Sequence, residues 1–206
     1  MVKEPVAGRV KTRLAREVGA VAATSFARRS AAGVIARLSH SRCWQVYLAV
    51  GPEAAIASRA WPLSLPRLAQ GPGDLGARMQ RIMDRLPRGP VVIIGTDIPG
   101  IGAAHIRSSF KLLASQDAVF GPAPDGGYWL VGLRRRLRVP RAFSRVRWST
   151  QHALADTRAN LDGMRLAEVP TLSDVDEVTE FVRFGSLAGR RVLPVVRVAL
   201  KPGCNA

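Results

Sequence analysis

The sequence predicts an α/β fold, a three-layer sandwich in which helices cover both faces of a mostly parallel sheet. Short apolar segments alternate with longer segments of helical periodicity, as in a chain that passes repeatedly between sheet and helix. Residues 90–100, PVVIIGTDIPG, contain a near-continuous apolar run that is typical of a strand buried on both faces. Turns rich in Gly and Pro separate these segments and mark where each element ends.

The helices are predicted from apolar residues at helical spacing and from capping residues. The first predicted helix, within residues 11–38, is Ala-rich, and Gly19 is placed to break it. Asp74 is a suitable N-cap for a later helix, and Ser149 or Thr150 for another. The expected helical segments are residues 11–38, 53–61, 74–86, 103–114 and 149–161, with a last helix beginning within 173–184.

The strands are predicted from short runs of Val, Ile, Leu and aromatic residues between turns. They are expected within residues 43–50, 90–100, 117–123, 128–133 and 165–170. We place this α/β domain at residues 1–184. Residues 185–206 show no clear period, and we expect a C-terminal tail of unknown role.

The composition limits the class of protein. With 206 residues, of which 47% are hydrophobic, the chain can bury the core of one domain. It has no run of 18 apolar residues and no apolar signal segment, so we expect no membrane association and a cytoplasmic location. Cys43 and Cys204 are too few for a disulfide framework.

The net charge of +16 raises the possibility of a nucleic-acid-binding module. However, 27 of the 31 basic residues are arginines scattered over almost every segment, and aromatic residues make up only 6%. Single-strand binding needs clustered cations interleaved with aromatic side chains. The densest cluster, residues 134–138, is expected to be a solvated loop. We therefore keep nucleic-acid binding only as an alternative.

Several carboxylates are candidates for a metal site. Asp97 directly follows the buried apolar run, where the carboxyl end of a strand opens into a ligand cleft. Asp174 and Asp176 precede a predicted helix, and one of them can cap it. A second carboxylate could instead join Asp97 around Mg²⁺, which prefers oxygen ligands and often bridges to phosphates.

Residues 122–133, PAPDGGYWLVGL, join two predicted strands. Gly126 and Gly127 suit a hairpin turn, and glycines also let a backbone approach a ligand closely. Tyr128 and Trp129 would then alternate, with one side chain toward the cleft and the other toward the core.

The opening stretch, KEPVAGRVKTRLA, places a Gly-containing loop before Lys11 and Arg13. Cations at a helix N-terminus oppose the helix dipole, so their placement there favours a bound anion. The alternative is a solvated basic first turn. The spacing of a Walker A loop is absent.

Six motifs in order resemble those of bacterial transferases of glycosyltransferase-A-like fold. They are KEPVAGRVKTRLA, QGPGDLGARM, IGTDIPGI, GPAPDGGYWLVGL, WST and SDVDE, between residue 3 and about 182. The family is mostly untested. Its members are called radical-SAM/selenodomain-associated or arsenosugar-type glycosyltransferases, and they are related to phospholactate and molybdenum-cofactor guanylyltransferases.

The resemblance implies a donor half, an acceptor half and a metal site. Donor phosphates would be held by Gly8, Lys11 and Arg13, with Gln70 and Gly71 near the base. Asp97 and Asp176 would bind the metal, and the catalytic residues would be Lys11, Arg13 and Asp97. The residues lining the acceptor site would be Asp125, Gly126, Gly127 and Tyr128, with Trp148 nearby. The family usually has a full strand before the first motif, whereas only Met1 and Val2 precede it here, so we expect a truncated first strand.

Together these features predict a transferase that depends on Mg²⁺ or Mn²⁺. The donor would be a nucleoside triphosphate or a nucleotide-sugar, and the acceptor a small molecule. Attack at the α-phosphorus would make it a nucleotidyltransferase, and attack at the anomeric carbon a glycosyltransferase. The residues do not decide between these two reactions. A non-catalytic, truncated relic is a further alternative.

Overall fold

The computed structural model describes residues 1–6, 10–136, 138–173 and 198–200. Its strands form two sheets that one stretch of chain connects. The smaller sheet has the order β1 (Val2–Lys3), β3 (Leu48–Gly51) and β4 (Arg67–Ala69), with all strands parallel. The larger sheet has the order β2 (Trp44–Val46), β9 (Val198–Leu200), β5 (Val91–Ile94), β7 (Tyr128–Leu133), β6 (Ala118–Pro122) and β8 (Leu166–Glu168).

The two sheets are joined at two points. Only Tyr47 separates β2 from β3, so residues 44–51 run from one sheet into the other. In addition, the amino group of Met1 donates a hydrogen bond of 2.6 Å to the carbonyl oxygen of Ile94, which brings the start of β1 beside the end of β5.

The smaller sheet is parallel throughout, as predicted, whereas the larger sheet is mixed. In the larger sheet β5 is antiparallel to β7 and β9, and β6 is antiparallel to β7 but parallel to β8. Since β2 is antiparallel to β9, the strands β2, β5, β6 and β8 all point the same way, and β7 and β9 oppose them. The turn at Gly126 and Gly127 joins the antiparallel pair β6 and β7, as expected for a hairpin.

The helices follow the predicted segments closely. They are α1 (Thr12–Val18), α2 (Ala20–Ser39), a 3₁₀ turn η1 (Glu53–Ala57), α3 (Leu75–Arg85), α4 (Ala103–Leu113) and α5 (Ala153–Ala159). Gly19 does break the first helix, with a φ of +85° that favours glycine. Asp74 caps α3 as predicted, because its carboxylate accepts a hydrogen bond from the Ala77 amide.

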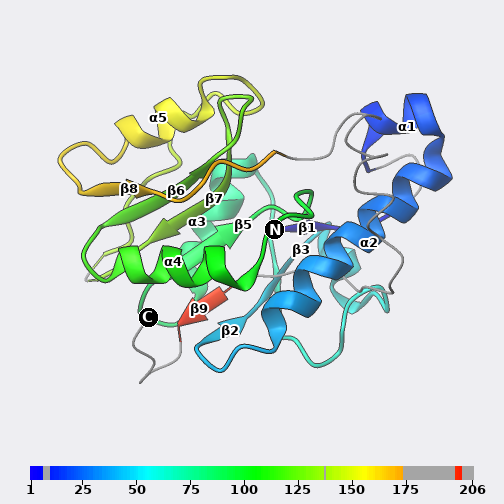
Figure 1. Ribbon diagram of the computed structural model, residues 1–206, viewed down its shortest axis with the longest axis horizontal. Helices are drawn as coiled ribbons and strands as arrows, with labels where there is room; N and C mark the ends of the chain where they lie inside the picture. The colour runs from blue at the N-terminus through cyan, green and yellow to red at the C-terminus, as the bar shows by residue number, and fades with distance from the viewer. Residues whose placement is uncertain (7–9, 137, 174–197, 201–206) are drawn as a thin grey trace.

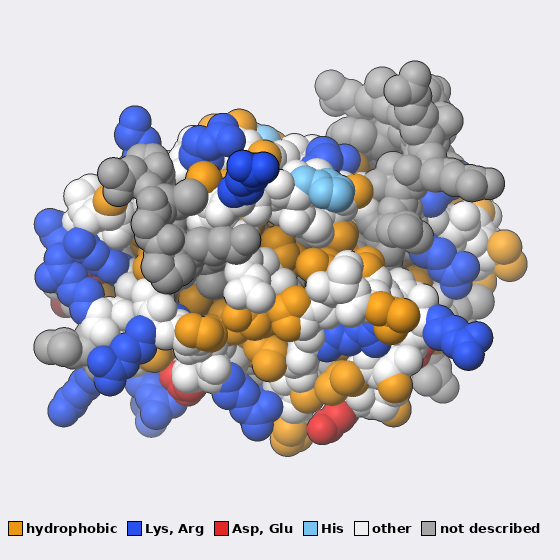
Figure 2. Space-filling model, turned by 90° about the horizontal axis from the view of Figure 1, so that it is seen from below, with side chains coloured by type: hydrophobic (Ala, Val, Ile, Leu, Met, Phe, Trp, Pro, Cys, Tyr) orange, Lys and Arg blue, Asp and Glu red, His pale blue; other side chains and the backbone are white. Residues whose placement is uncertain are grey.

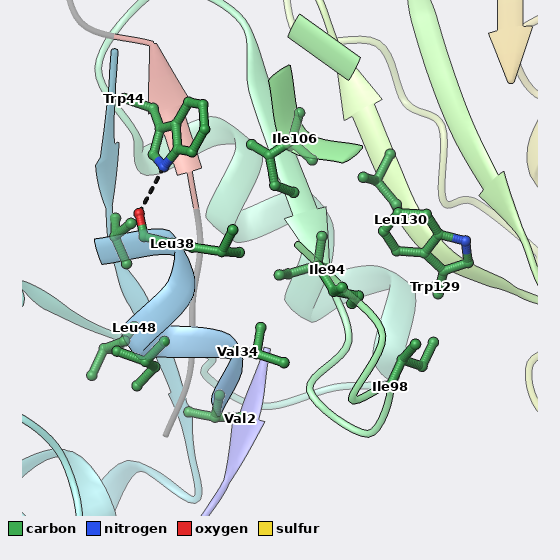
Figure 3. Close-up of a cluster of buried hydrophobic side chains, with 14 of the residues drawn as sticks. Val2, Val34, Leu38, Trp44, Leu48, Ile94, Ile98, Ile106, Trp129 and Leu130 are labelled. Carbon is green, nitrogen blue, oxygen red and sulfur yellow. Dashed lines mark hydrogen bonds between the residues drawn. The ribbon is translucent and has the colours of Figure 1, made fainter. Parts of the chain in front are cut away.

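The core lies on both faces of β5, which explains its continuous apolar run. Val92 and Ile94 belong to a cluster with side chains of α2 and α4, whereas Val91 and Ile93 belong to a second cluster with side chains of α3. Figure 3 shows part of the first cluster, where Trp44 donates a hydrogen bond to the carbonyl oxygen of Leu38. In Figure 1, α4 lies in front of the strands and α3 behind them, so the three-layer prediction is confirmed.

Three local features differ from the expectations. Residues 67–69 form β4, which is not among the strands predicted from the sequence. The N-cap of α5 is His152, and neither Ser149 nor Thr150 occupies that position. Finally, Arg135 is buried rather than solvated, because its guanidinium donates hydrogen bonds to the carbonyl oxygens of Met83, Leu86, Pro87 and Gly89 at the end of α3.

The predicted tail contributes β9 to the larger sheet, between β2 and β5. The expected helix within residues 173–184 and the boundary at residue 184 lie outside the described residues. On the face in Figure 2, Lys and Arg side chains are spread around the periphery, with hydrophobic side chains between them. None of the helices in the described ranges is long and apolar enough to cross a bilayer.

Candidate active site

Two cavities of similar size open beside the carboxyl end of β5 and share a wall. We call the first, of about 430 Å³, the aromatic cavity, since Tyr128, Trp129 and Trp148 line it. We call the second, of about 410 Å³, the basic cavity, since Lys3 and Lys11 line it. The residues that line both cavities are Met1, Leu75, Gly95 and Asp97. A molecule in one cavity can therefore approach a molecule in the other near Asp97.

The loop that carries Asp97 is fixed to α2 by three hydrogen bonds. The Ser30 hydroxyl donates to the carbonyl oxygen of Thr96 at 3.2 Å. Arg37 donates from Nε to Ile101 at 2.9 Å and from Nη2 to Pro99 at 2.6 Å. Partial burial lowers the pKa of Arg37. These bonds hold both sides of the turn after β5, so Asp97 projects from an anchored loop.

Lys11 lies against Asp97. Its Nζ is 3.5 Å from Oδ2 of Asp97, and its side chain is only 5% exposed, whereas that of Asp97 is 58% exposed. The backbone of Lys11 is left-handed, with a φ of +47°. Such conformations are uncommon outside glycine and are often found at functional sites. The structure thus brings together two of the three residues predicted to be catalytic.

The other predicted donor residues are placed as follows. Gln70 lines the basic cavity, and its side-chain amide donates hydrogen bonds of 2.8 Å to the carbonyl oxygens of Val2 and Ala49. Gly71 does not line either cavity. Its φ is +73°, and a methyl group placed on it would lie 2.6 Å from the guanidinium of Arg81, which supports this loop. Gly8 and the side chain of Arg13 lie outside the described residues.

Four of the five predicted acceptor residues line the aromatic cavity: Asp125, Gly127, Tyr128 and Trp148. The fifth, Gly126, does not line it. It has a φ of +80°, and a methyl group placed there would lie 2.2 Å from the carbonyl oxygen of Gln151. The absence of a side chain at Gly126 therefore lets the β6–β7 hairpin pack against the segment that follows Trp148. Asp125 stabilises the hairpin by accepting a hydrogen bond from the Gly127 amide at 2.9 Å.

The aromatic side chains of the cavity contact one another edge to face. The rings of Tyr128 and Trp148 are 6.4 Å apart at 72°, and those of Tyr128 and Phe120 are 5.7 Å apart at 69°. The Tyr128 hydroxyl is hydrogen-bonded to Thr157 on α5 at 3.3 Å. Burial raises the pKa of Tyr128, so its phenol remains neutral and can serve as a donor or an acceptor at physiological pH.

The loop of Trp148 is closed by a bidentate ion pair. Arg147 donates to Asp156 on α5 from Nε at 2.9 Å and from Nη2 at 2.7 Å, and the Arg147 amide adds a third bond of 2.9 Å. The side-chain hydrogen bonds from Arg147 hold the pKa of Asp156 below its usual range. The pair fixes the start of the segment that lines one wall of the aromatic cavity, from Trp148 to Thr150.

The chain is similar to known proteins in both sequence and fold. Residues 34–150, more than half of the chain, match the sequence family described as "Uncharacterized protein conserved in bacteria (DUF2064)". The chain belongs to the DUF2064 family.

The fold of this DUF2064 protein is also similar to a crystal structure from Desulfovibrio desulfuricans G20, described as a "putative nucleotide-diphospho-sugar transferase". The TM-score is 0.77 and the identity 30%, over 86% of this chain and 80% of the other. This similarity confirms the expected glycosyltransferase-A-like fold. No curated protein matches the chain. The finer relation to phospholactate, molybdenum-cofactor or arsenosugar enzymes stays a prediction.

The site of this DUF2064 protein also includes residues that we did not predict. Leu75 and Met79 of α3 line the aromatic cavity, and Trp61 and Thr96 line the basic cavity. The i, i+4 spacing of Leu75 and Met79 on a helix places them on one face, a signal that could have found this pair. Thr96 directly precedes Asp97, so its place after the buried strand is also a signal, whereas Trp61 has none because only the tertiary fold brings it to the basic cavity.

The described residues fit a divalent cation that completes its coordination with phosphates and water. No three or more His, Cys, Asp or Glu side chains gather closely enough to enclose a metal in the described ranges, and Asp176 lies outside them. Asp97 is exposed at the shared wall, and Asp125 is exposed in the aromatic cavity. One or two carboxylates with substrate phosphates are the usual ligands of Mg²⁺.

Proposed function

We propose that this protein is a Mg²⁺-dependent glycosyltransferase that binds a nucleotide-sugar in the basic cavity and a small-molecule acceptor in the aromatic cavity. The observation that carries the proposal is the Lys11–Asp97 pair at the wall between two separate cavities. A group transferase needs two adjacent sites and positive charge where they meet. The similarity to the Desulfovibrio desulfuricans G20 protein, described as a "putative nucleotide-diphospho-sugar transferase", supports a nucleotide-sugar donor.

In this proposal an acceptor hydroxyl in the aromatic cavity attacks the anomeric carbon of the donor. A new carbon–oxygen bond forms as the bond to the nucleoside diphosphate breaks, and the proton of the acceptor hydroxyl is released to water. Lys11 stabilises the negative charge that develops on the leaving diphosphate, and a bound Mg²⁺ would supply further neutralisation of this charge. Asp97 orients Lys11 and is the carboxylate placed to hold the cation.

The experiment is a thermal-shift series with Mg²⁺, using nucleotide-sugars and nucleoside triphosphates as ligands. The proteins are the native chain, Lys11→Met, and Asp162→Asn as a matched control, since Asp162 is exposed and lines neither cavity. A ligand at 100 times its Kd stabilises the folded state by about 2.7 kcal/mol. We expect a nucleotide-sugar to stabilise the native chain and the control, and to stabilise Lys11→Met far less.

Two other outcomes would change the conclusion. Stabilisation by triphosphates alone would replace glycosyl transfer by nucleotidyl transfer, in which the acceptor attacks the α-phosphorus and pyrophosphate leaves. If no nucleotide stabilises a protein that melts cooperatively, the donor site is refuted.

A further inference from the structure

The two cavities differ in charge in a way that bears on the acceptor. The protein carries 31 Lys and Arg side chains and a net charge of +16. Lys3 and Lys11 line the basic cavity. In contrast, no described Lys, Arg or His lines the aromatic cavity, where the charged side chains are the carboxylates of Asp97 and Asp125. Lys, Arg and His side chains are thus absent from the described lining of this cavity, and the amino group of Met1, which also lines it, donates a hydrogen bond to the carbonyl oxygen of Ile94.

The carboxylate of Asp125 sets the charge of the aromatic cavity. Asp97 is paired with Lys11, but Asp125 forms no ion pair with any residue that the structure describes. Asp125 accepts a hydrogen bond from the Gly127 amide, which fixes it in the turn. A carboxylate or phosphate group of a ligand would therefore meet like charge at Asp125, and the described lining of the cavity offers no Lys, Arg or His side chain to compensate for it.

The remaining walls are apolar and aromatic. Met79, Ile93 and Val131 form one part, and the rings of Tyr128 and Trp148 form another. The faces of aromatic rings bind other rings, the apolar faces of hydroxylated molecules and cations rather than anions. The walls and the carboxylates therefore select the same kind of ligand.

We propose that the aromatic cavity binds a small molecule that has an apolar or aromatic face, carries a hydroxyl or amino group and has no anionic group. The role of this ligand as the acceptor rests on the proposed function, but the selectivity of the cavity does not. The acceptor would thus differ from the donor in charge, so each substrate is directed to its own cavity.

The test uses three probes with the same ring: benzyl alcohol, benzylamine and benzoate. Binding is measured by titration in NMR spectra, following the indole N–H signal of Trp148, which is identified by its loss in Trp148→Phe. We expect benzyl alcohol and benzylamine each to bind at least about tenfold more tightly than benzoate. Which of the two binds more tightly shows whether the natural ligand is neutral or cationic.

Asp125→Asn tests the source of the selectivity. Asparagine can still accept the hydrogen bond from Gly127, so the turn is retained. Since Asp125 is exposed, removing its charge is expected to lower the preference for benzylamine over benzoate by about threefold to fivefold. Asp162→Asn should leave this ratio unchanged.

Three results would overturn the proposal: benzoate binding as tightly as the other probes, an unchanged ratio in Asp125→Asn, or no binding of any probe to the folded protein. Nucleotide binding is measured on the same samples by thermal shift. Selective probe binding without nucleotide binding would refute the proposed function but support this inference. Nucleotide binding without selective probe binding would support the proposed function but refute this inference.

Discussion

The ammonium group of Lys11 lies 3.5 Å from the carboxylate of Asp97, although the two residues come from opposite ends of the first half of the chain. Lys11 precedes α1, and Asp97 follows β5. Their meeting point is the wall between the two cavities, so this pair links the sequence motif at the N-terminus to the central strand of the sheet.

Asp97→Asn should impair ligand binding without unfolding the protein. The Asp97 side chain is 58% exposed, so water reaches its end of the pair, whereas Lys11 is only 5% exposed and loses an ion-pair partner. We expect the free energy of unfolding without ligand, measured by urea denaturation, to fall by no more than about 2 kcal/mol, whereas stabilisation by a nucleotide with Mg²⁺ is largely lost. A loss of more than about 3 kcal/mol without ligand would show that the pair is structural.

Gly126→Ala should destabilise the protein by about 2 kcal/mol or more. Its φ is +80°, and a methyl group there would lie 2.2 Å from the carbonyl oxygen of Gln151. The matched control is Gly163→Ala, where φ is +74° but no atom lies within 4 Å, so only about 1 kcal/mol is expected. Equal losses in the two variants, measured by urea denaturation, would contradict the close packing of the hairpin.

Arg135→Met should lower the free energy of unfolding by about 2–4 kcal/mol. Four carbonyl oxygens at the end of α3 lose their donor in this variant while they remain partly buried. Methionine keeps much of the apolar stem, so the loss reports mainly on the guanidinium. Arg136→Met is the control, since Arg136 is exposed and should change stability by less than about 0.5 kcal/mol. Similar losses of unfolding free energy in both variants would show that the Arg135 guanidinium is solvated and not buried.

The Arg147–Asp156 pair predicts a specific pH dependence. Arg147 holds the pKa of Asp156 below its usual range, so the folded state favours the ionised carboxylate. This stabilisation is fully present above the unfolded pKa of about 3.9 and is lost as the pH falls below it. The free energies of unfolding of the native chain and Asp156→Asn, measured by urea denaturation, should therefore differ at pH 6 and become more similar as the pH is lowered. A difference that stays constant down to pH 2.5 would contradict the ion pair.

The elements that could be predicted are those whose signals are local. The apolar run of β5 and the capping residue Asp74 lie within a few residues of the structure that they specify. The same holds for Asp97, whose place after a buried strand marks the ligand edge of an α/β sheet.

The features that could not be predicted depend on partners far away in the sequence. β4 has only three half-buried residues, and its pairing with β3 defines it. Arg135 is buried because the end of α3 presents carbonyl oxygens to it. The aromatic cavity likewise combines α3, the hairpin and the loop of Trp148, and no single segment indicates that they enclose a common space.

The position of β9 has a consequence for how the protein folds during synthesis. β9 pairs with both β2 and β5, which leave the ribosome long before it does. Until residues 198–200 emerge, these two strands each have an open edge toward the other, a position where a nascent sheet is prone to pair with another chain. Completion of the larger sheet thus waits until residues 198–200 have been synthesised, and chaperones that cover strand edges would matter most in that interval.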